Sequence, residues 1–345
     1  MTFPDRNFGG SGTYARSLVA ALRERDDIEV GEMRSSPPGL ARTVRWLVRG
    51  ASDQLRASGA EFLHCPNFVV PWNVPVPFVA TVFDLSTRRF PGDHPLEWRA
   101  YESWVMPSRA KAAARVIAIS ELTRRDVIET YGVASHRAVT IYPGVDSRFF
   151  REPATARAPG TEPRLVFPGA PVARKNLDLV LRAMAAADPE SHVGRACLQI
   201  SGAAAEKFPE QVARIAALGL TKRVQWLGQV AADAMPGVIA AADVCVYPSL
   251  YEGFGFPPLE AMASGTPVVA SNAACLPEIL GDAAVLVDPN DVSAFGEAVE
   301  GILSNPEVRT RLVEAGRKRV RDFTWERCAE RTLDVYLEAL AEGIP

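Results

Sequence analysis

Two glutamates and two glycines in one short stretch are the first indication of chemistry in this chain. Glu252 and Glu260 are eight positions apart, and Gly253 and Gly255 lie between them. Glycines let a phosphate approach main-chain N–H groups closely, and the beginning of a following helix adds positive potential. A carboxylate beside such a site repels the anion, so its use there is to hold hydroxyl groups. The stretch therefore predicts a ligand with both an anionic part and hydroxyls, as in a nucleotide sugar.

The surrounding sequence predicts a strand, a loop and a helix in that order. Residues 244–247 form a short apolar run with β-branched and aromatic side chains, which is typical of a buried strand. The loop covers 248–256, and the helix over 257–264 begins with prolines and is closed by Gly265. With a further strand at 266–270, this is one unit of a parallel α/β sheet. Ligands of such sheets bind at the carboxyl ends of the strands.

A pair of adjacent cations supplies the positive charge that a diphosphate requires. Arg174 and Lys175 follow a predicted strand at 164–167 and precede a predicted helix. Taken alone, the pair would be two solvated basic side chains. Combined with the glycine loop, it predicts that both segments meet at one edge of the sheet and neutralise the same anion.

The rest of the chain alternates between predicted strands and helices, which is typical of α/β domains. The predicted strands cover 28–33, 61–64, 77–85, 116–118, 138–141, 196–200 and 223–227, and the predicted helices cover 14–22, 40–57, 205–218, 232–241, 291–303, 306–320 and a last segment that ends near Leu340.

Length and composition agree with two α/β domains. The chain has 345 residues, of which 48% are hydrophobic, and its net charge of −3 argues against a general nucleic-acid binder. Its five cysteines are scattered without a Cys-x-x-Cys pair, which predicts reduced thiols and no zinc site. No apolar run has the length of a membrane span and no signal peptide is visible, so we expect a cytoplasmic protein.

The central stretch resembles a known motif. Residues 248–271 are similar to the Glu-(seven residues)-Glu segment of the retaining glycosyltransferases of family four, with Glu252 and Glu260 as its two glutamates. Tyr-Pro-Gly-Val-Asp at 142–146 and Gly-(four residues)-Arg-Lys-Asn at 169–176 also resemble this family. The resemblance extends from Gly9 to about Leu340. It implies the GT-B fold, with two Rossmann-like, doubly wound domains facing across a cleft and a C-terminal helix that crosses back to the first domain.

The resemblance also implies a domain division. Residues 1–150 would form an acceptor-side domain, and 164–323 a nucleotide-sugar-binding domain. Residues 324–345 would form the crossover helix. Between the domains, 151–163 are rich in proline and alanine and show no periodicity, so we interpret them as a linker.

The family pattern implies a role for each residue of the site. Glu260 would hold the ribose hydroxyls and Glu252 the sugar hydroxyls. Arg174 and Lys175 would stabilise the leaving diphosphate. Glu252 as a covalent nucleophile is disfavoured, because no second carboxylate is placed to act as the acid. The implied donor-binding residues also include Gly10, Gly12, Val230, Gly253, Phe254 and Gly255.

The reaction implied is transfer of a hexosyl unit with retention at the anomeric carbon. No Asp-x-Asp motif occurs, so we expect the cations to take the place of a metal, with no cofactor. The diphosphate itself would accept the proton of the acceptor. We favour GDP-mannose over a UDP-sugar, because the motifs at 142–146 and 174–176 look most like those of bacterial mannosyltransferases.

The first domain departs from the family in two places. Family members usually have a buried strand before the Gly-Gly loop, whereas here only eight residues precede Gly9, so we expect that strand to be missing or short. Phe83 stands where the family has a histidine beside the transferred sugar. Asp84 is retained, and with His94 it is our prediction for the acceptor side.

The segment Leu40–Ala57 predicts a basic amphipathic helix. It could lie on an anionic membrane that carries a lipid-linked acceptor, making the protein peripheral at the inner face. A solvated face on an ordinary packed helix is the favoured interpretation.

Three other functions are alternatives to a glycosyltransferase. A nucleotide-sugar epimerase of the same fold would act on the donor without an acceptor. A catalytically inactive subunit would bind nucleotide sugar without turnover. An NAD-dependent dehydrogenase is disfavoured, since no Gly-x-Gly-x-x-Gly follows a strand. The sequence does not name the acceptor, which could be a glycan, a lipid-linked molecule or a natural product.

Overall fold

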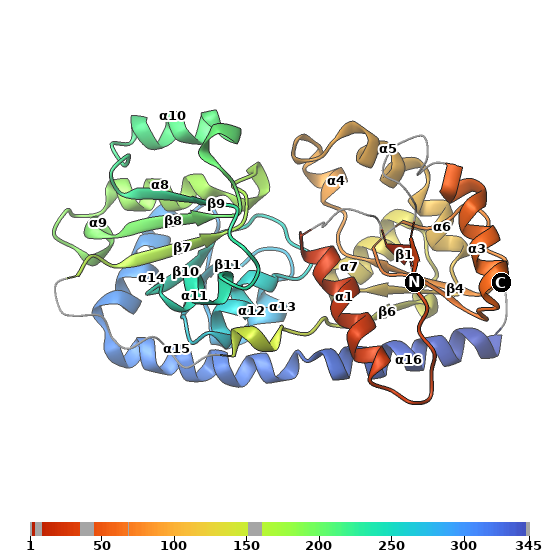
Figure 1. Cartoon of the computed structure of the whole chain (residues 1–345). Coiled ribbons are helices and arrows are strands. Elements are labelled where there is room, and N and C mark those ends of the chain that lie inside the picture. Colours follow the sequence, from red (N-terminus) through yellow and green to blue (C-terminus); the bar gives the residue numbers. More distant parts are fainter. Residues whose placement is uncertain (1, 4–8, 35–44, 68, 151–160, 343–345) are drawn as a thin grey trace. The chain divides into compact units, whose positions relative to one another are not determined.

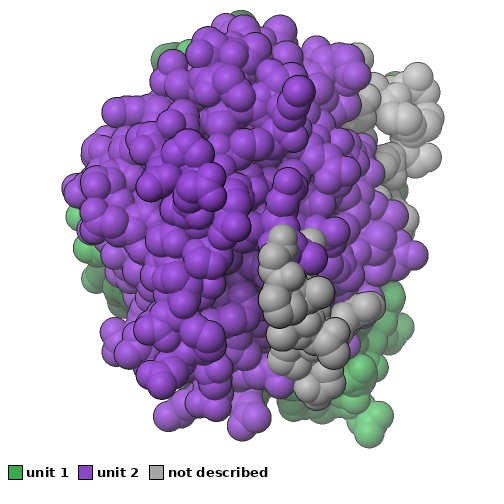
Figure 2. Space-filling model, turned by 90° about the vertical axis from the view of Figure 1, so that its left-hand side faces the viewer, with its two compact units in different colours: residues 1–144, 323–345 green, residues 145–322 purple. Residues whose placement is uncertain are grey.

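The chain divides into two compact units. The computed structural model describes residues 2–3, 9–34, 45–67, 69–150 and 161–342. The first unit combines residues 1–144 with 323–345, and the second covers 145–322 (Figures 1 and 2).

The second unit contains a six-stranded, wholly parallel sheet in the order β12-β11-β10-β7-β8-β9. The chain fills one side from β7 to β9, returns to the middle, and fills the other side from β10 to β12. The order therefore reverses between β7 and β10, and ligands of such sheets bind at this point. The strands are β7 (Arg164–Pro168), β8 (Cys197–Ser201), β9 (Val224–Gly228), β10 (Val244–Tyr247), β11 (Val268–Ser271) and β12 (Val285–Val287).

Helices between these strands cover the sheet (Figure 1). One face packs on α8 and α14, where Leu165, Phe167 and Val246 are buried beside Val180 and Phe295. The helices are α8 (Leu177–Ala186), α9 (His192–Arg195), α10 (Pro209–Ala217), α11 (Met235–Ala240), α12 (Phe256–Ala263), α13 (Leu276–Leu280), α14 (Val292–Ser304) and α15 (Pro306–Arg319), with short 3₁₀ turns η5 (Ser147–Phe149) and η6 (Ala173–Lys175).

The first unit has a four-stranded parallel sheet in the order β3-β4-β5-β6 and a separate pair, β1-β2. The strands are β1 (Thr2–Phe3), β2 (Met33–Arg34), β3 (Leu63–Cys65), β4 (Phe78–Val82), β5 (Arg115–Ala118) and β6 (Ala138–Thr140). The described helical segments are α1 (Gly9–Arg23), the π-helix η1 (Trp46–Gly50), α3 (Ala51–Ser58), α4 (Ser86–Arg89), the 3₁₀ helix η2 (Pro91–Asp93), α5 (Leu96–Trp104), α6 (Met106–Ala112), α7 (Glu121–Asp126), the π-helix η3 (Val127–Tyr131), the 3₁₀ helix η4 (Ser135–Arg137) and α16 (Trp325–Glu342). In the described part of the chain, no helix combines the length and apolar character needed to cross a bilayer.

The C-terminal helix α16 belongs to the first unit, as expected of a helix that crosses back. Its Tyr336 hydroxyl lies 2.5 Å from Nδ1 of His64 in β3, and Nε2 of His64 lies 2.8 Å from Thr81 Oγ1 in β4. Burial lowers the pKa of His64 to about 3, so the ring is neutral at physiological pH. At the C-terminal end of α16, the carboxylate of Glu342 accepts two hydrogen bonds from the buried Arg115 guanidinium.

Most predicted elements of the second unit lie within a few residues of the observed ones. The predicted elements of the first unit differ more from the observed ones. The strand predicted at 28–33 was wrong, since only Met33 of that range lies in a strand, β2. The helices α4, α5 and α6 were missed. The first strand exists as the two residues of β1. Of the predicted helix Leu40–Ala57, residues 40–44 lie outside the described residues, and the remainder forms η1 and α3.

The predicted boundary between the domains also differs from the observed one. The chain passes from the first unit into the second between Gly144 and Val145, several residues before the linker predicted at 151–163. Of that linker, residues 151–160 lie outside the described residues.

Gly144 gives a test of how α16 is attached. A Cβ at Gly144 would lie 2.3 Å from the backbone nitrogen of Trp325 and 2.7 Å from its Cγ. We expect Gly144→Ala to lower the free energy of unfolding by about 3 kcal/mol, because the first turn of α16 must move away. Urea unfolding of the full chain measures this.

Gly301→Ala is the matched control, since a Cβ at that position in α14 would meet no described atom within 4 Å beyond its chain neighbours and the backbone of its own helix. It should leave stability unchanged or raise it by up to about 1 kcal/mol. Equal effects of the two substitutions would contradict the tight contact at Gly144.

Candidate functional site

The reversal point of the second sheet brings the predicted cations and the predicted loop together. The turn η6 follows β7, and the loop 248–255 follows β10, the neighbouring strand. The N–H of Leu250 donates to the carbonyl of Arg174 at 2.7 Å, and Arg174 Nη1 donates to the carbonyl of Tyr251 at 3.1 Å. The two segments therefore form one edge of a site at the carboxyl ends of the strands.

Glu252 is the centre of a buried group of charges. Its Oε1 lies 2.7 Å from Arg174 Nη1 and 3.3 Å from Lys175 Nζ, and it accepts a hydrogen bond of 3.0 Å from Ser249 Oγ. Lys175 Nζ also donates to the Tyr247 hydroxyl at 3.0 Å. Glu252 and Lys175 are each 8% exposed, so water screens these charges weakly. Two cations on one carboxylate leave this edge of the site with one positive charge in excess.

The charge states follow from this pairing. Burial alone would raise the pKa of Glu252, but Lys175 and Arg174, with hydrogen bonds from Tyr247 and Ser249, hold the pKa below its ordinary value. Burial lowers the pKa of Lys175, and the Glu252 carboxylate opposes that shift. Glu252 is therefore ionised and forms ion pairs with two cations. The sequence alone predicted that it would be available to sugar hydroxyls.

Lys175 is fixed by its neighbours. Its Nζ lies 4.4 Å from the centroid of the Tyr247 ring. A Cβ at Gly169 would lie 3.2 Å from both Cε and Nζ of Lys175, and Gly169 has a φ of +102°. Glycine at 169 therefore provides both the backbone conformation and the space for the lysine.

The glycine loop presents main-chain donors beside these cations. Gly253 and Gly255 are buried, and within the described ranges neither backbone N–H has a hydrogen-bond acceptor. Gly255 is the N-cap of α12 with a φ of +93°, and a Cβ there would lie 2.9 Å from Leu276 Cδ2. Phe254 between them is 2% exposed and packs edge-on against Phe256 at 5.0 Å. Buried N–H groups without a protein acceptor are suited to an anion.

Glu260 lies on α12 near a second acidic group. Ser264 Oγ donates to the carbonyl of Phe149 at 3.1 Å, which holds α12 against the turn η5. Asp146 precedes that turn and forms an ion pair with Arg148 at 2.7 Å. Burial, with the Asp146 charge as a second cause, raises the pKa of Glu260 to about 7. Glu260 therefore exists near neutral pH in both the protonated and the ionised form.

The remaining predicted donor residues have simpler surroundings. Val230 follows β9 and is partly exposed. Gly10 and Gly12 were predicted to form a turn ahead of a helix. This prediction was wrong, because both residues lie inside the first turns of α1. Three glycines and two small polar residues can continue a helix once Tyr14 and Leu18 are buried below it.

The structure brings together Asp84 and His94, the two residues predicted for the acceptor side, through a residue that the sequence did not indicate. The N–H of Ser86 donates to Asp84 Oδ1 at 2.8 Å, and Ser86 Oγ lies 2.9 Å from His94 Nε2. Phe83 is 7% exposed and packs edge-on against Tyr14 at 5.1 Å. The position of the family histidine is therefore filled by a buried apolar contact.

Sequence reasoning also missed four residues around the candidate donor site. Tyr247 and Ser249 contact Lys175 and Glu252, and Asp146 and Arg148 surround Glu260. A signal was present for three of them. Tyr247 and Ser249 stand at the carboxyl end of a strand, where ligands of parallel sheets bind, and Asp146 ends the Tyr-Pro-Gly-Val-Asp motif.

Comparison with known proteins agrees with this architecture. Residues 149–319 match the family model described as glycosyl transferases group 1, and residues 8–149 match the one described as Glycosyltransferase Family 4. The O-antigen chain mannosyltransferase B of Escherichia coli is 29% identical over 327 residues, which cover 92% of this chain and 82% of that protein. Against other curated relatives the matched region spans between 52% and 98% of their length.

Solved structures share the fold. The sucrose-phosphate synthase of Thermosynechococcus elongatus has a TM-score of 0.80 at 24% identity, covering 97% of this chain and 94% of that one. The Anabaena protein HepE in complex with UDP and glucose has a TM-score of 0.74 at 18% identity, covering 97% and 98%.

Two parallel-sheet units of this kind define the GT-B class of glycosyltransferases. The chain belongs to the glycosyltransferases of the family four type, and it resembles the bacterial mannosyltransferases among them.

The buried charge group gives a test of coupling. We expect Glu252→Gln to lower the free energy of unfolding by about 3 kcal/mol, because it leaves Lys175 and Arg174 buried without their anion. Lys175→Met should rescue part of this loss, so that the two losses are not additive by at least about 1 kcal/mol. A double-mutant cycle from urea unfolding measures the coupling.

The exposed pair Arg214 and Asp178, 2.6 Å apart, provides the control cycle. Its coupling should be under about 1 kcal/mol, since water screens it. Additive losses at Glu252 and Lys175 would show that their contact has no energetic weight.

Glu260 gives a test by pH. The raised pKa means that the folded protein retains a proton that the unfolded chain releases above its ordinary value of 4.5. Its stabilising effect is complete below pH 4.5 and is lost as the pH rises to about 7, by up to about 3 kcal/mol at 1.36 kcal/mol per pKa unit.

Glu260→Gln should remove this component from the pH profile of urea unfolding between pH 5 and pH 8. Glu314→Gln, on the exposed surface of α15, should leave the profile of the wild type unchanged. Parallel profiles for the wild type and Glu260→Gln would contradict the raised pKa.

Proposed function

We propose that this glycosyltransferase moves a hexosyl unit, with mannosyl favoured, from a nucleotide diphosphate sugar to an acceptor hydroxyl, with retention and without a metal ion. The observation that carries the proposal is the meeting of Arg174, Lys175 and the N–H groups of Gly253 and Gly255 at the reversal point of one sheet, where these N–H groups have no acceptor among the described residues. Positive charge and main-chain donors at one edge suit a diphosphate.

The proposed chemistry needs little more than that charge. The bond between the anomeric carbon and the diphosphate oxygen breaks, and the electron pair stays on the diphosphate. The cations, the loop N–H groups and the positive end of α12 stabilise this charge as it develops. The acceptor oxygen then attacks the same face, and its proton passes to a diphosphate oxygen. No protein base is required in this route, so Phe83 in place of a histidine is compatible with it.

The two glutamates have different parts in this proposal. Glu260 holds ribose hydroxyls, and as a group with a pKa of about 7 it can both donate and accept a hydrogen bond. Glu252 is neutralised by Arg174 and Lys175. It fixes both cations toward the diphosphate, and sugar hydroxyls would reach its remaining lone pairs.

The preference for GDP-mannose rests on likeness. The Escherichia coli relative is a mannosyltransferase by name, and the HepE structure contains UDP and glucose. A UDP-sugar is therefore the second donor to be tested. On the acceptor side, Asp84, Ser86 and His94 form a polar group that suits a hydroxyl-bearing acceptor. A peripheral association with the inner membrane face would bring in a lipid-linked acceptor.

Thermal unfolding with a panel of nucleotide sugars tests the donor. A donor at one hundred times its dissociation constant should stabilise the protein by about 2.7 kcal/mol. Glu260→Ala should lose most of this stabilisation, whereas Glu314→Ala should keep it. A Glu260→Ala variant that is stabilised as much as the wild type would refute the role of Glu260.

Release of nucleoside diphosphate, measured with and without added acceptors, separates the alternatives. A transferase releases it only when an acceptor is present, beyond slow hydrolysis. An epimerase would convert the donor without any acceptor. A binding subunit would be stabilised by the donor and release nothing with any acceptor.

A further inference from the structure

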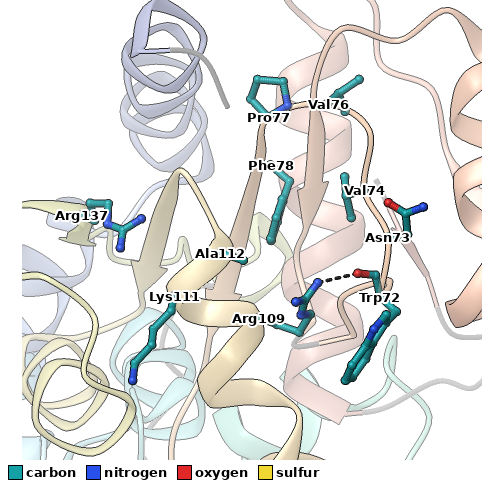
Figure 3. A pocket seen from close by; sticks show the side chains of 10 residues that line it. All are labelled: Trp72, Asn73, Val74, Val76, Pro77, Phe78, Arg109, Lys111, Ala112 and Arg137. Carbon is teal, nitrogen blue, oxygen red and sulfur yellow. Dashed lines mark hydrogen bonds between the residues drawn. The ribbon is translucent and has the colours of Figure 1, made fainter. Parts of the chain in front are cut away.

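A second group of cations lies in the first unit, in a pocket with a volume of about 480 Å³. Arg109, Lys111 and Arg137 line it together with Trp72 and Phe78 (Figure 3). Figure 3 shows Arg109 beside Trp72, with Lys111 and Arg137 on the other side of Phe78.

Sheet topology separates this pocket from the acceptor-side residues. Phe78 is the first residue of β4, Arg137 directly precedes β6, and Lys111 lies in the last turn of α6 before β5. These strands are parallel, so the pocket lies at their amino ends. Asp84 follows the carboxyl end of β4, at the opposite edge of the sheet. The cations and the glycine loop of the candidate donor site belong to the second unit.

The lining carries three positive charges and no carboxylate. Glu342 is the acidic group near Arg137, and its carboxylate is bound by Arg115. Among the residues that the structure describes, the cations therefore have no anion within the pocket itself. Basic side chains with no balancing acid attract an anion.

Arg109 is held in place but retains hydrogen-bonding capacity. Its Nη1 donates to the carbonyl of Trp72 at 2.5 Å, and its guanidinium lies 5.1 Å from the centroid of the Trp72 ring. Its Nε–H is buried and has no hydrogen-bond partner among the described residues. A guanidinium fixed in this way is preorganised for the oxygens of a phosphate.

The remaining lining is apolar and aromatic. Val74, Val76 and Phe78 line the pocket, and Trp72 at its rim is 53% exposed. The N–H of Trp72 donates to the carbonyl of Leu47 at 2.8 Å. The next residue, Val48 of η1, therefore lies near Trp72 in space, and it is 46% exposed. The lining thus suits a molecule that joins a phosphate to an apolar or planar part.

We propose that this pocket binds a phosphate group carried on a partly apolar molecule. Two sources share this chemistry. One is a small organic phosphate in solution. The other is the head group of an anionic lipid, since a half-exposed tryptophan beside cations is the combination that favours a lipid surface. The proposal does not rest on the donor site of the second unit.

Hydrogen–deuterium exchange of the full chain tests the proposal, because it locates the bound ligand. The probes are phenyl phosphate, phosphatidylglycerol vesicles and phosphatidylcholine vesicles. We expect slower exchange in 72–78 and 109–113 with phenyl phosphate, with phosphatidylglycerol, or with both, and the active probe identifies the source. Protection of 249–256 would report the donor site separately, so failure of one site does not affect the other.

In the variant Lys111→Gln/Arg137→Gln, the probe concentration that gives half of the full protection should rise about tenfold, since two of the three cations are lost. Arg125→Gln, which removes one exposed arginine from α7, should leave it unchanged. Absence of protection at 72–78 with both anionic probes would overturn the proposal. Equal protection by phosphatidylcholine, or unchanged protection in the double variant, would also overturn it.

Discussion

The second unit depends on one buried carboxylate that two cations share. Oε1 of Glu252 lies 2.7 Å from Arg174 and 3.3 Å from Lys175, and these residues come from turns that follow neighbouring strands. Leaving any one of the three charges alone in this buried place would be costly. The contact therefore joins the two turns. It also leaves a fixed excess of positive charge where the sheet order reverses, which is what an incoming diphosphate requires.

The pKa of Glu260, the second acidic residue of the motif, is shifted in the opposite direction to that of Glu252. Glu260 has a raised pKa of about 7, because burial and the neighbouring Asp146 disfavour its charge. Asp146 in turn is held ionised by Arg148, which lowers its pKa. Glu252 is thus kept ionised by two cations, whereas Glu260 is partly protonated near pH 7. An anion beside them meets less repulsion than two ionised carboxylates would produce.

The motif and the strand pattern predicted the second unit well, since each strand there is a compact apolar run. The pairing of Glu252 with Arg174 was not predicted, because the two residues are 78 positions apart and only the fold brings them together. In the first unit, α5 has an exposed Leu96 and an exposed Trp104 at its ends, so it lacks the apolar stripe that identifies a helix. Gly10 and Gly12 were assigned to a turn, since local propensity does not reveal that burial of the following residues extends α1 over them.

A crystal structure of the chain with GDP bound is the most direct test of the central claim. The account predicts phosphate oxygens within about 2.7–3.2 Å of the backbone nitrogens of Gly253 and Gly255 and of Arg174 or Lys175. It also predicts that Glu252 keeps its contact with Lys175 in that complex. GDP bound with its phosphates away from this loop and these cations would contradict the account.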